Sequence, residues 1–199
     1  MNARRSHALS LVIALALAGC RREATPPPQS TSPNPATPAA VFSVQSPART
    51  ALISAGEESP RFRVTAHDGR LIENTGVRQR PLVVYFYPRD ETPGCTVEAH
   101  GFRDHSREFE AAGVDVVGVS TDSNDRHRSF ASGHSLGFAL VSDPDGQLAS
   151  AFGVGVRLGF AQRVTIIIGK SGVVAKVFES VTPDGHAEEV LTAVRAAAQ

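Results

Sequence analysis

The stretch that decides the fold reads PLVVYFYPRDETPGCTVEAHGFRD and runs from Pro81 to Asp104. It opens with an apolar run over residues 82–86, rich in β-branched and aromatic side chains, which is typical of a buried central strand. Residues 88–94 then include two prolines and a glycine, which cannot continue a strand. The stretch therefore predicts a strand that ends in a loop just before residue 95.

A helix is predicted to begin near Cys95, because Ala99, Phe102 and Phe109 recur on one helical face. A free cysteine has a pKa near ~8.5, and only its thiolate is a nucleophile. The unpaired N–H groups and partial positive charge of a helix N-terminus favour that thiolate. A buried cysteine can also be an inert small hydrophobe. Here its neighbours at 92–94 are Thr, Pro and Gly rather than aliphatic residues, which favours chemistry.

Two strings around this cysteine resemble a known family. The pattern Pro88-x-x-x-Thr92-x-x-Cys95 is similar to the peroxidatic-cysteine motif of the peroxiredoxins. The fuller string FYPRDETPGCTVEA, residues 86–99, resembles the bacterioferritin comigratory protein (peroxiredoxin Q) branch. The resemblance covers about two-thirds of the chain, in order and at the spacing of the family, through these landmarks: Gly118-Val119-Ser120-x-Asp122, Ser142-Asp143-Pro144, Phe152-Gly153-Val154, and Arg163-x-Thr165 with Gly172.

The resemblance implies a thiol-dependent peroxidase that reduces hydrogen peroxide and organic hydroperoxides. The Cys95 thiolate would attack one peroxide oxygen and leave a sulfenic acid. The family assigns the stabilisation of the shifting charge to the Thr92 hydroxyl, the Cys95 N–H and an arginine, here Arg163. Pro88 would shield the thiolate, and Glu98 would orient Arg163. Two plainer alternatives are that Arg163 is a strand-end surface charge and that Glu98 is a first-turn acid complementing the helix dipole.

His100 departs from the commonest pattern of the branch. Many relatives carry a resolving cysteine five residues after the peroxidatic one, and this chain has histidine there. The second of its two cysteines is Cys20. The resemblance therefore implies a one-cysteine peroxidase, recycled by an external thiol reductant that is thioredoxin-like, glutaredoxin-like or a small thiol.

The N-terminus has the layout of a secretory signal peptide, with two arginines ahead of an apolar run at residues 8–18. That run of roughly 11 residues is too short to span a bilayer, which takes about 20. It ends in Leu-Ala-Gly-Cys20, which resembles a bacterial lipobox, so residues 1–19 would be removed and Cys20 acylated; a secreted protein cleaved nearby is the alternative. Arg21 stands where an Asp would argue for inner-membrane retention in similar lipoproteins. We expect a domain anchored in the cell envelope, with the outer membrane favoured.

The residues that follow are expected to form a tether and then one domain. Residues 20–50 are rich in Pro, Ser and Thr and poor in large apolar side chains, which predicts a disordered spacer. Residues 51–199 alternate strand and helix signals, which indicates an α/β fold. The resemblance sharpens this to a thioredoxin-like fold with a mixed sheet, flanking helices and an N-terminal hairpin.

The remaining elements of the domain can be placed from periodicity and turn signals. We expect a hairpin over 61–65 and 71–72, strands at 114–119 and 138–141, helices at 124–132 and up to 152, a strand pair at 164–168 and 173–178, and a last helix with Thr182 as N-cap and Pro183 in its first turn. The glycine-rich string at 153–159 has the wrong spacing for a dinucleotide loop and is predicted to be a plain loop. His105 is expected to be packed rather than functional.

Other classes of function fit less well. Lys+Arg and Asp+Glu both number 20, so no basic surplus suggests nucleic acid. The seven histidines show no paired metal-ligand spacing, and no metal or cofactor is expected. A disulfide oxidoreductase needs Cys-x-x-Cys, which Cys95-Thr96-Val97-Glu98 lacks. A copper-delivery module of the cell envelope on the same fold, using Cys95 with a histidine, remains the alternative. We expect a monomer.

Overall fold

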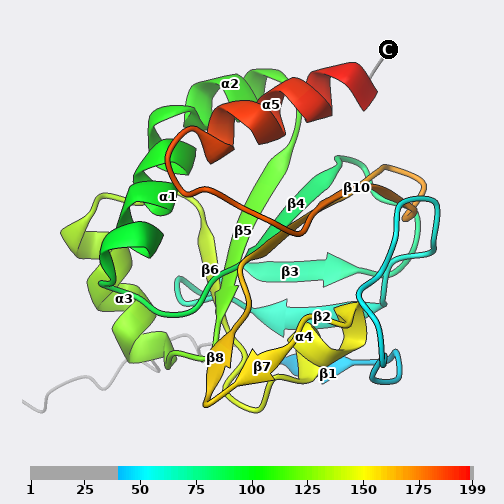
Figure 1. The fold of residues 1–199 in the computed structure, drawn as a ribbon, viewed down its shortest axis with the longest axis horizontal. Coiled ribbons are helices and arrows are strands. Elements are labelled where there is room, and N and C mark those ends of the chain that lie inside the picture. Colours follow the sequence, from blue (N-terminus) through cyan, green and yellow to red (C-terminus); the bar gives the residue numbers. More distant parts are fainter. Residues whose placement is uncertain (1–39, 198–199) are drawn as a thin grey trace, which may run out of the picture. The chain divides into compact units, whose positions relative to one another are not determined.

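The computed structural model describes residues 40–197, which are built around a five-stranded mixed sheet (Figure 1). β4 is its central strand, parallel to β5 on one side and antiparallel to β9 on the other. The sheet order is β10 (Val174–Phe178), β9 (Val164–Ile168), β4 (Leu82–Phe86), β5 (Asp115–Ser120) and β6 (Ala139–Ser142). The strands predicted from the apolar runs are therefore confirmed.

Both faces of β4 are buried, which explains why its sequence is continuously apolar rather than alternating. Val83 and Tyr85 point into a cluster formed by the helices on one face. Val84 and Phe86 point into a second cluster, which includes Phe152 of the short helix α4 (Gln147–Phe152).

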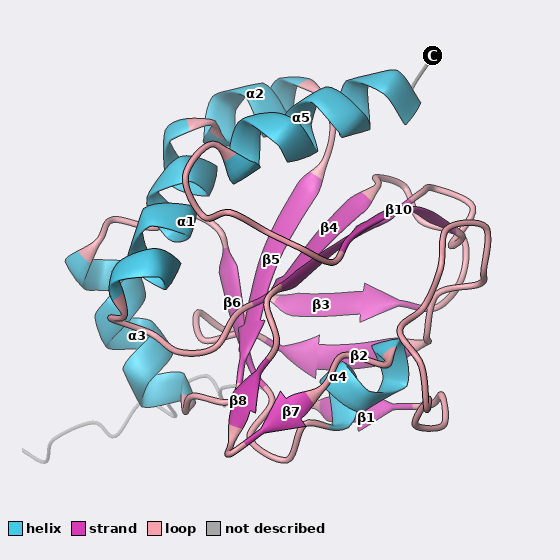
Figure 2. Cartoon of the chain, in the orientation of Figure 1, coloured by secondary structure: helices cyan, strands magenta, loops and turns pink. Residues whose placement is uncertain are grey.

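The helical face is covered by α1, α2, α3 and α5, and the opposite face by α4 and a small antiparallel sheet (Figure 2). The helices are α1 (Pro93–Asp104), α2 (Ser106–Ala111), α3 (Asn124–Gly133) and α5 (His186–Ala197). The small sheet contains β1 (Phe42–Val44), β2 (Phe62–Thr65) and β3 (Leu71–Asn74), of which β2 and β3 are the predicted hairpin. No helix among residues 40–197 is long and apolar enough to cross a membrane.

Two helix predictions need correction. The helix that begins near Cys95 is broken at His105, which is half-buried. Phe109 belongs to the second helix, α2, and its ring centre lies 5.7 Å from that of Phe102. The last helix begins at His186 and not after Thr182. Gly185 has a φ of 76°, a left-handed conformation that a helix cannot pass through, so the proline signal belongs to a turn.

The predicted start of the domain at Ala51 is too late. β1, residues 42–44, pairs antiparallel with β2, and Phe42 lies opposite Val64. Prolines surround this segment in the sequence, and its pairing with β2 is what makes it a strand. The signal peptide 1–19, Cys20 and the tether up to residue 39 lie outside the described residues.

The string at 153–159 also differs from the predicted plain loop. Its second half joins the following residues in a hairpin of two short strands, β7 (Val156–Arg157) and β8 (Phe160–Ala161). This β7–β8 hairpin leads into β9 through residues 162 and 163.

Candidate active site

The pairing of β4 with β9 brings the two halves of the site together. Phe86 at the end of β4 lies opposite Val164 at the start of β9. The chain leaving β4 therefore passes beside Arg163 before it enters α1 at Pro93. Cys95, in the first turn of α1, is buried with 1% of its surface exposed.

The first turn of α1 contains Cys95. Its first helical hydrogen bond is donated by the Thr96 N–H to the Thr92 carbonyl, so the Cys95 N–H precedes the helical ladder. Thr92 is the N-cap residue but makes no side-chain cap; its hydroxyl donates to the Arg89 carbonyl at 3.0 Å. The Thr92 hydroxyl therefore does not cap the first turn of α1.

Arg163 bridges the cysteine and a buried carboxylate. Its Nη2 lies 3.1 Å from the Cys95 sulfur, and its Nη1 donates to Glu98. Burial lowers the pKa of Arg163, but the Glu98 carboxylate and the sulfur raise it by more, so it ends above its ordinary value. Arg163 is therefore fixed as a cation against the sulfur, which the surface-charge alternative does not predict.

Glu98 is fully buried beneath this guanidinium. Burial raises the pKa of Glu98 to about 7, and the attraction of Arg163 offsets part of the effect. Its Oε1 and the Tyr85 hydroxyl are buried and have no hydrogen-bond partner within residues 40–197. Glu98 lies beyond the first turn of α1, which contains no acid, so it does not act there as the alternative supposed.

The loop between β4 and α1 is held by a buried polar network that the sequence did not reveal. The Tyr87 hydroxyl donates to Asp90 at 2.7 Å, and His127 Nδ1 lies 2.8 Å from the other carboxylate oxygen of Asp90. The Asp90 N–H in turn donates to Asp122 at 2.7 Å. The half-buried Pro88 lies in the same loop. The network therefore fixes the backbone that carries Pro88 and Thr92.

His127 supports the loop from α3. Its side chain is fully buried, and its Nε2 lies 3.2 Å from the Val141 carbonyl while its Nδ1 faces Asp90. Both ring nitrogens thus face oxygen acceptors. The only sequence signals were a histidine in a polar helix and an aspartate in a loop, which do not predict that the two meet.

His100 contacts a second histidine. Its Nε2 is 3.0 Å from Nδ1 of His134, and His134 Nε2 lies 3.0 Å from the Glu91 carboxylate. Position 100, which the resemblance assigns to a resolving cysteine, therefore carries a histidine that links α1 to the end of α3. Cys95 is the free cysteine of the described part of the chain, and no three metal-binding side chains cluster there.

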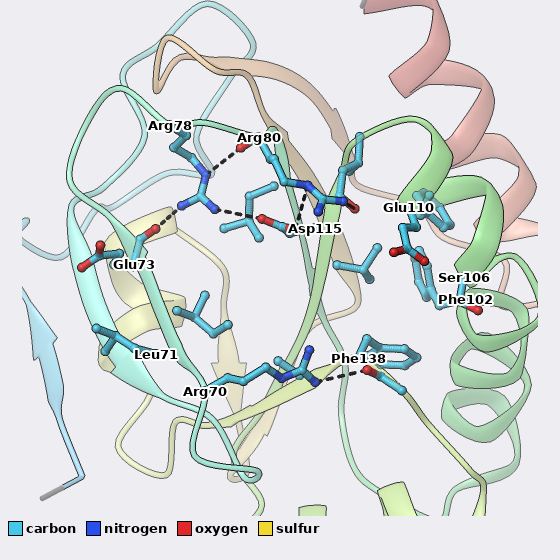
Figure 3. A pocket seen from close by; sticks show the side chains of 17 residues that line it. Arg70, Leu71, Glu73, Arg78, Arg80, Phe102, Ser106, Glu110, Asp115 and Phe138 are labelled. Carbon is cyan, nitrogen blue, oxygen red and sulfur yellow. Dashed lines mark hydrogen bonds and ion pairs between the residues drawn. The ribbon is translucent and has the colours of Figure 1, made fainter. Parts of the chain in front are cut away.

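A separate cavity of about 680 Å³ lies between β3, β5 and the helices α1 and α2 (Figure 3). Its arginines are already paired: Arg78 and Arg80 lie 3.7 and 3.2 Å from Asp115. None of the predicted site residues lines this cavity. The arrangement that can do chemistry is the one at Cys95.

Comparisons with known proteins agree on one group. The family model described as the AhpC/TSA family matches residues 55–177. Peroxiredoxin Bcp of Escherichia coli is 36% identical over 146 residues, covering 70% of this chain and 94% of that protein. The chloroplastic peroxiredoxin Q of Sedum lineare is 38% identical over 144 residues, covering 71% and 77%. Among solved structures, Xanthomonas campestris peroxiredoxin Q matches with a TM-score of 0.64 and 35% identity, over 69% of this chain and 91% of that one.

Proposed function

The chain belongs to the AhpC/TSA family as a peroxiredoxin of the bacterioferritin comigratory (peroxiredoxin Q) type, and from this premise we propose that Cys95 carries its peroxidase reaction. The protein is a thiol-dependent peroxidase with a thioredoxin-like fold, as predicted. The observation that carries the proposal is the 3.1 Å contact between Arg163 Nη2 and the Cys95 sulfur. A guanidinium at that distance favours thiolate and can hydrogen-bond an incoming peroxide.

The proposed reaction follows from this geometry. The Cys95 thiolate attacks one oxygen of the hydroperoxide, an S–O bond forms and the O–O bond breaks. The leaving oxygen takes the proton that the thiol released, which gives water or an alcohol, and the sulfur becomes sulfenic acid. The Cys95 N–H and Arg163 stabilise the charge as it moves between the oxygens, and the Thr92 hydroxyl, which donates to the Arg89 carbonyl, accepts a hydrogen bond from the hydroperoxide O–H. Glu98 holds Arg163 in position, and Pro88 limits access of water to the sulfur.

The recycling step needs a thiol from outside the chain. One external thiol condenses with the sulfenic acid, releasing water and leaving a mixed disulfide. A second thiol then attacks that disulfide and restores Cys95. This one-cysteine scheme is supported by the histidine at position 100 and by the predicted acylation of Cys20.

Cys95→Ser tests the assignment. We expect no peroxide consumption with dithiothreitol as donor, while circular dichroism and the melting temperature stay close to those of the natural protein. The matched control is Ser106→Ala, an exposed position in α2. Substantial turnover by Cys95→Ser would remove Cys95 from the reaction.

The comparisons give no support to the copper-delivery alternative, and stoichiometric Cu(I) binding by the peroxidase-competent protein would be needed to revive it.

The anchoring of the protein is a second, separate proposal. We infer a lipoprotein of the cell envelope, held at the outer membrane, and the support is the lipobox-like string that ends at Cys20 together with Arg21. Labelled palmitate should enter the natural chain and not Cys20→Ser, and only the natural chain should partition into a detergent phase. Label in both chains, or in neither, would contradict acylation at Cys20.

A further inference from the structure

The β7–β8 hairpin carries an unusual share of the exposed apolar surface. Eight large hydrophobic side chains are exposed among residues 40–197, and Val156, Leu158 and Phe160 all belong to this hairpin. Leu158 is 97% exposed, more than any of the others. Grouped exposed apolar side chains mark interaction surfaces more often than scattered ones do.

The turn is held in a conformation that presents Leu158 to solvent. Leu158 has a φ of 52°, which is rare for a side chain of this size. The Thr121 hydroxyl donates to the Gly159 carbonyl at 2.6 Å, and the Gln162 N–H donates to the Gly155 carbonyl at 2.8 Å. These two hydrogen bonds hold the turn in its strained conformation. Strain that is maintained in this way is common at functional sites, which suggests a function for the exposed Leu158.

The hairpin is flanked by two arginines and by one exposed acid, Asp145, whose neighbour Gly146 packs against Val156. Arg157 is exposed between the apolar side chains, and the Arg89 guanidinium lies 5.5 Å from the Phe160 ring centre. Asp122, the acid beside Arg89, is buried and already contacts Arg126 at 2.8 Å. No Asp or Glu occurs in the sequence between Asp145 and Glu179. Apolar side chains interleaved with cations match the interface of an anionic bilayer.

We propose that the β7–β8 hairpin docks the domain onto an anionic lipid surface, with Leu158 and Phe160 inserted at the level of the headgroups. Arg157 and Arg89 then face lipid phosphates. Arg163, which contacts the Cys95 sulfur, follows the hairpin directly, so docking turns the site loop toward the membrane. Hydroperoxides carried by lipid chains are the substrates that this orientation favours.

The inferred anchor strengthens the docking without being required for it. Twenty or so residues of proline-rich chain reach at most about 60 Å, so an acylated Cys20 would keep the domain within reach of the bilayer. A weak contact made by the hairpin then becomes an intramolecular event at high effective concentration.

The chain contains no tryptophan, which makes a sharp test possible. Leu158→Trp and Phe160→Trp each introduce a single fluorescent reporter, and Phe160→Trp avoids the strained position. Val77→Trp is the matched control, because Val77 is 83% exposed and precedes β4, at the opposite end of the sheet from the hairpin. The full-length protein is mixed with vesicles of phosphatidylcholine and phosphatidylglycerol, with and without bromine on the acyl chains.

We expect brominated chains to quench the two hairpin reporters about twofold or more, and to leave the Val77→Trp signal unchanged. Adding Arg157→Glu to Phe160→Trp should reduce the quenching on anionic vesicles. Equal quenching of hairpin and control reporters would overturn the proposal. A blue shift that ignores bromine and disappears on dilution would overturn it in favour of self-association. Peroxide consumption in solution is measured in parallel, so a failure to insert leaves the peroxidase assignment intact.

Discussion

At the scale of single residues, the geometry of the site depends on the two contacts made by the Arg163 guanidinium. Arg163 contacts the Cys95 sulfur through Nη2 and Glu98 through Nη1. It therefore places a positive charge beside the thiol, and Glu98 holds that charge in position. A lysine has one point of charge and cannot hold both contacts in a fixed fork. The geometry therefore favours an arginine over a lysine at this position.

Arg163→Met should slow the attack on peroxide by at least about tenfold, or ~1.4 kcal/mol of activation free energy. The reason is the loss of the cation that stabilises thiolate and polarises peroxide. Alkylation of Cys95 by iodoacetamide at neutral pH should also slow in the variant. The rate of Arg163→Lys should lie between those of the natural protein and Arg163→Met, and Arg107→Met, an exposed position in α2, serves as the control. An unchanged rate of peroxide attack together with an unchanged alkylation rate would remove Arg163 from the mechanism.

Glu98 should leave a signature in the pH dependence of stability. Its pKa is about 7 in the folded protein and near 4.5 without the burial, so between these values the folded state binds more protons than the unfolded one. The contribution of Glu98 to stability is complete below pH 4.5 and is lost as pH rises through 7, about 3 kcal/mol in all.

Glu98→Gln should abolish the loss of stability that Glu98 causes as pH rises through 7. Urea unfolding at pH 5 and pH 8 would show the free energy of unfolding of the natural protein falling more steeply with pH than that of the variant. Glu110→Gln changes an exposed carboxyl of α2 and should follow the natural protein. Parallel pH profiles for Glu98→Gln and the natural protein would mean that Glu98 titrates in the folded state much as it does in the unfolded chain.

At the scale of elements, α1 controls whether the oxidised sulfur can be resolved within the chain. Cys95 and His100 lie in the same helix, and five residues of ideal helix separate their Cα atoms by roughly 8 to 9 Å. A disulfide tolerates only up to about 7 Å. The first turn must therefore unwind before a cysteine at position 100 could reach the sulfur, and terminal turns are the least stable part of a helix.

His100→Cys should form an internal disulfide after one equivalent of peroxide, and should resist overoxidation better than the natural protein. Mass spectrometry of the treated variant gives the answer, with His105→Cys, too far along the chain to link, as the control. If Cys95 proceeds to sulfinic acid while the new thiol stays free, α1 does not open. The interpretation of His100 as a lost resolving position would then be wrong.

The elements also show how far the sequence could be read. The continuous apolar run of β4 and the breaker-rich loop before Cys95 depend on neighbouring residues, so they were predicted correctly. The family motif predicted that Cys95 and Arg163 act together, and the structure places Arg163 Nη2 3.1 Å from the Cys95 sulfur. The contact between Asp90 and His127 was not, since two polar residues 37 positions apart are buried together only by tertiary packing. β1 was missed because its stability comes from pairing with β2 and not from its own composition.

At the scale of the whole molecule, the pairing of β4 with β9 governs when the chain becomes reactive. Residues 82–86 and 164–168 are far apart in sequence, and loop-closure entropy makes such contacts form late in folding. Only this pairing brings Arg163 to Cys95, whereas α1 is local and can form early. A chain that has made its helices but not docked β9 therefore carries an ordinary, slowly reacting thiol.

During refolding from urea, rapid alkylation of Cys95 should appear after the helical circular dichroism has recovered, and simultaneous recovery would contradict this order. Late activation therefore protects the incompletely folded chain from oxidation, because Cys95 reacts slowly with peroxide until the surrounding fold is complete.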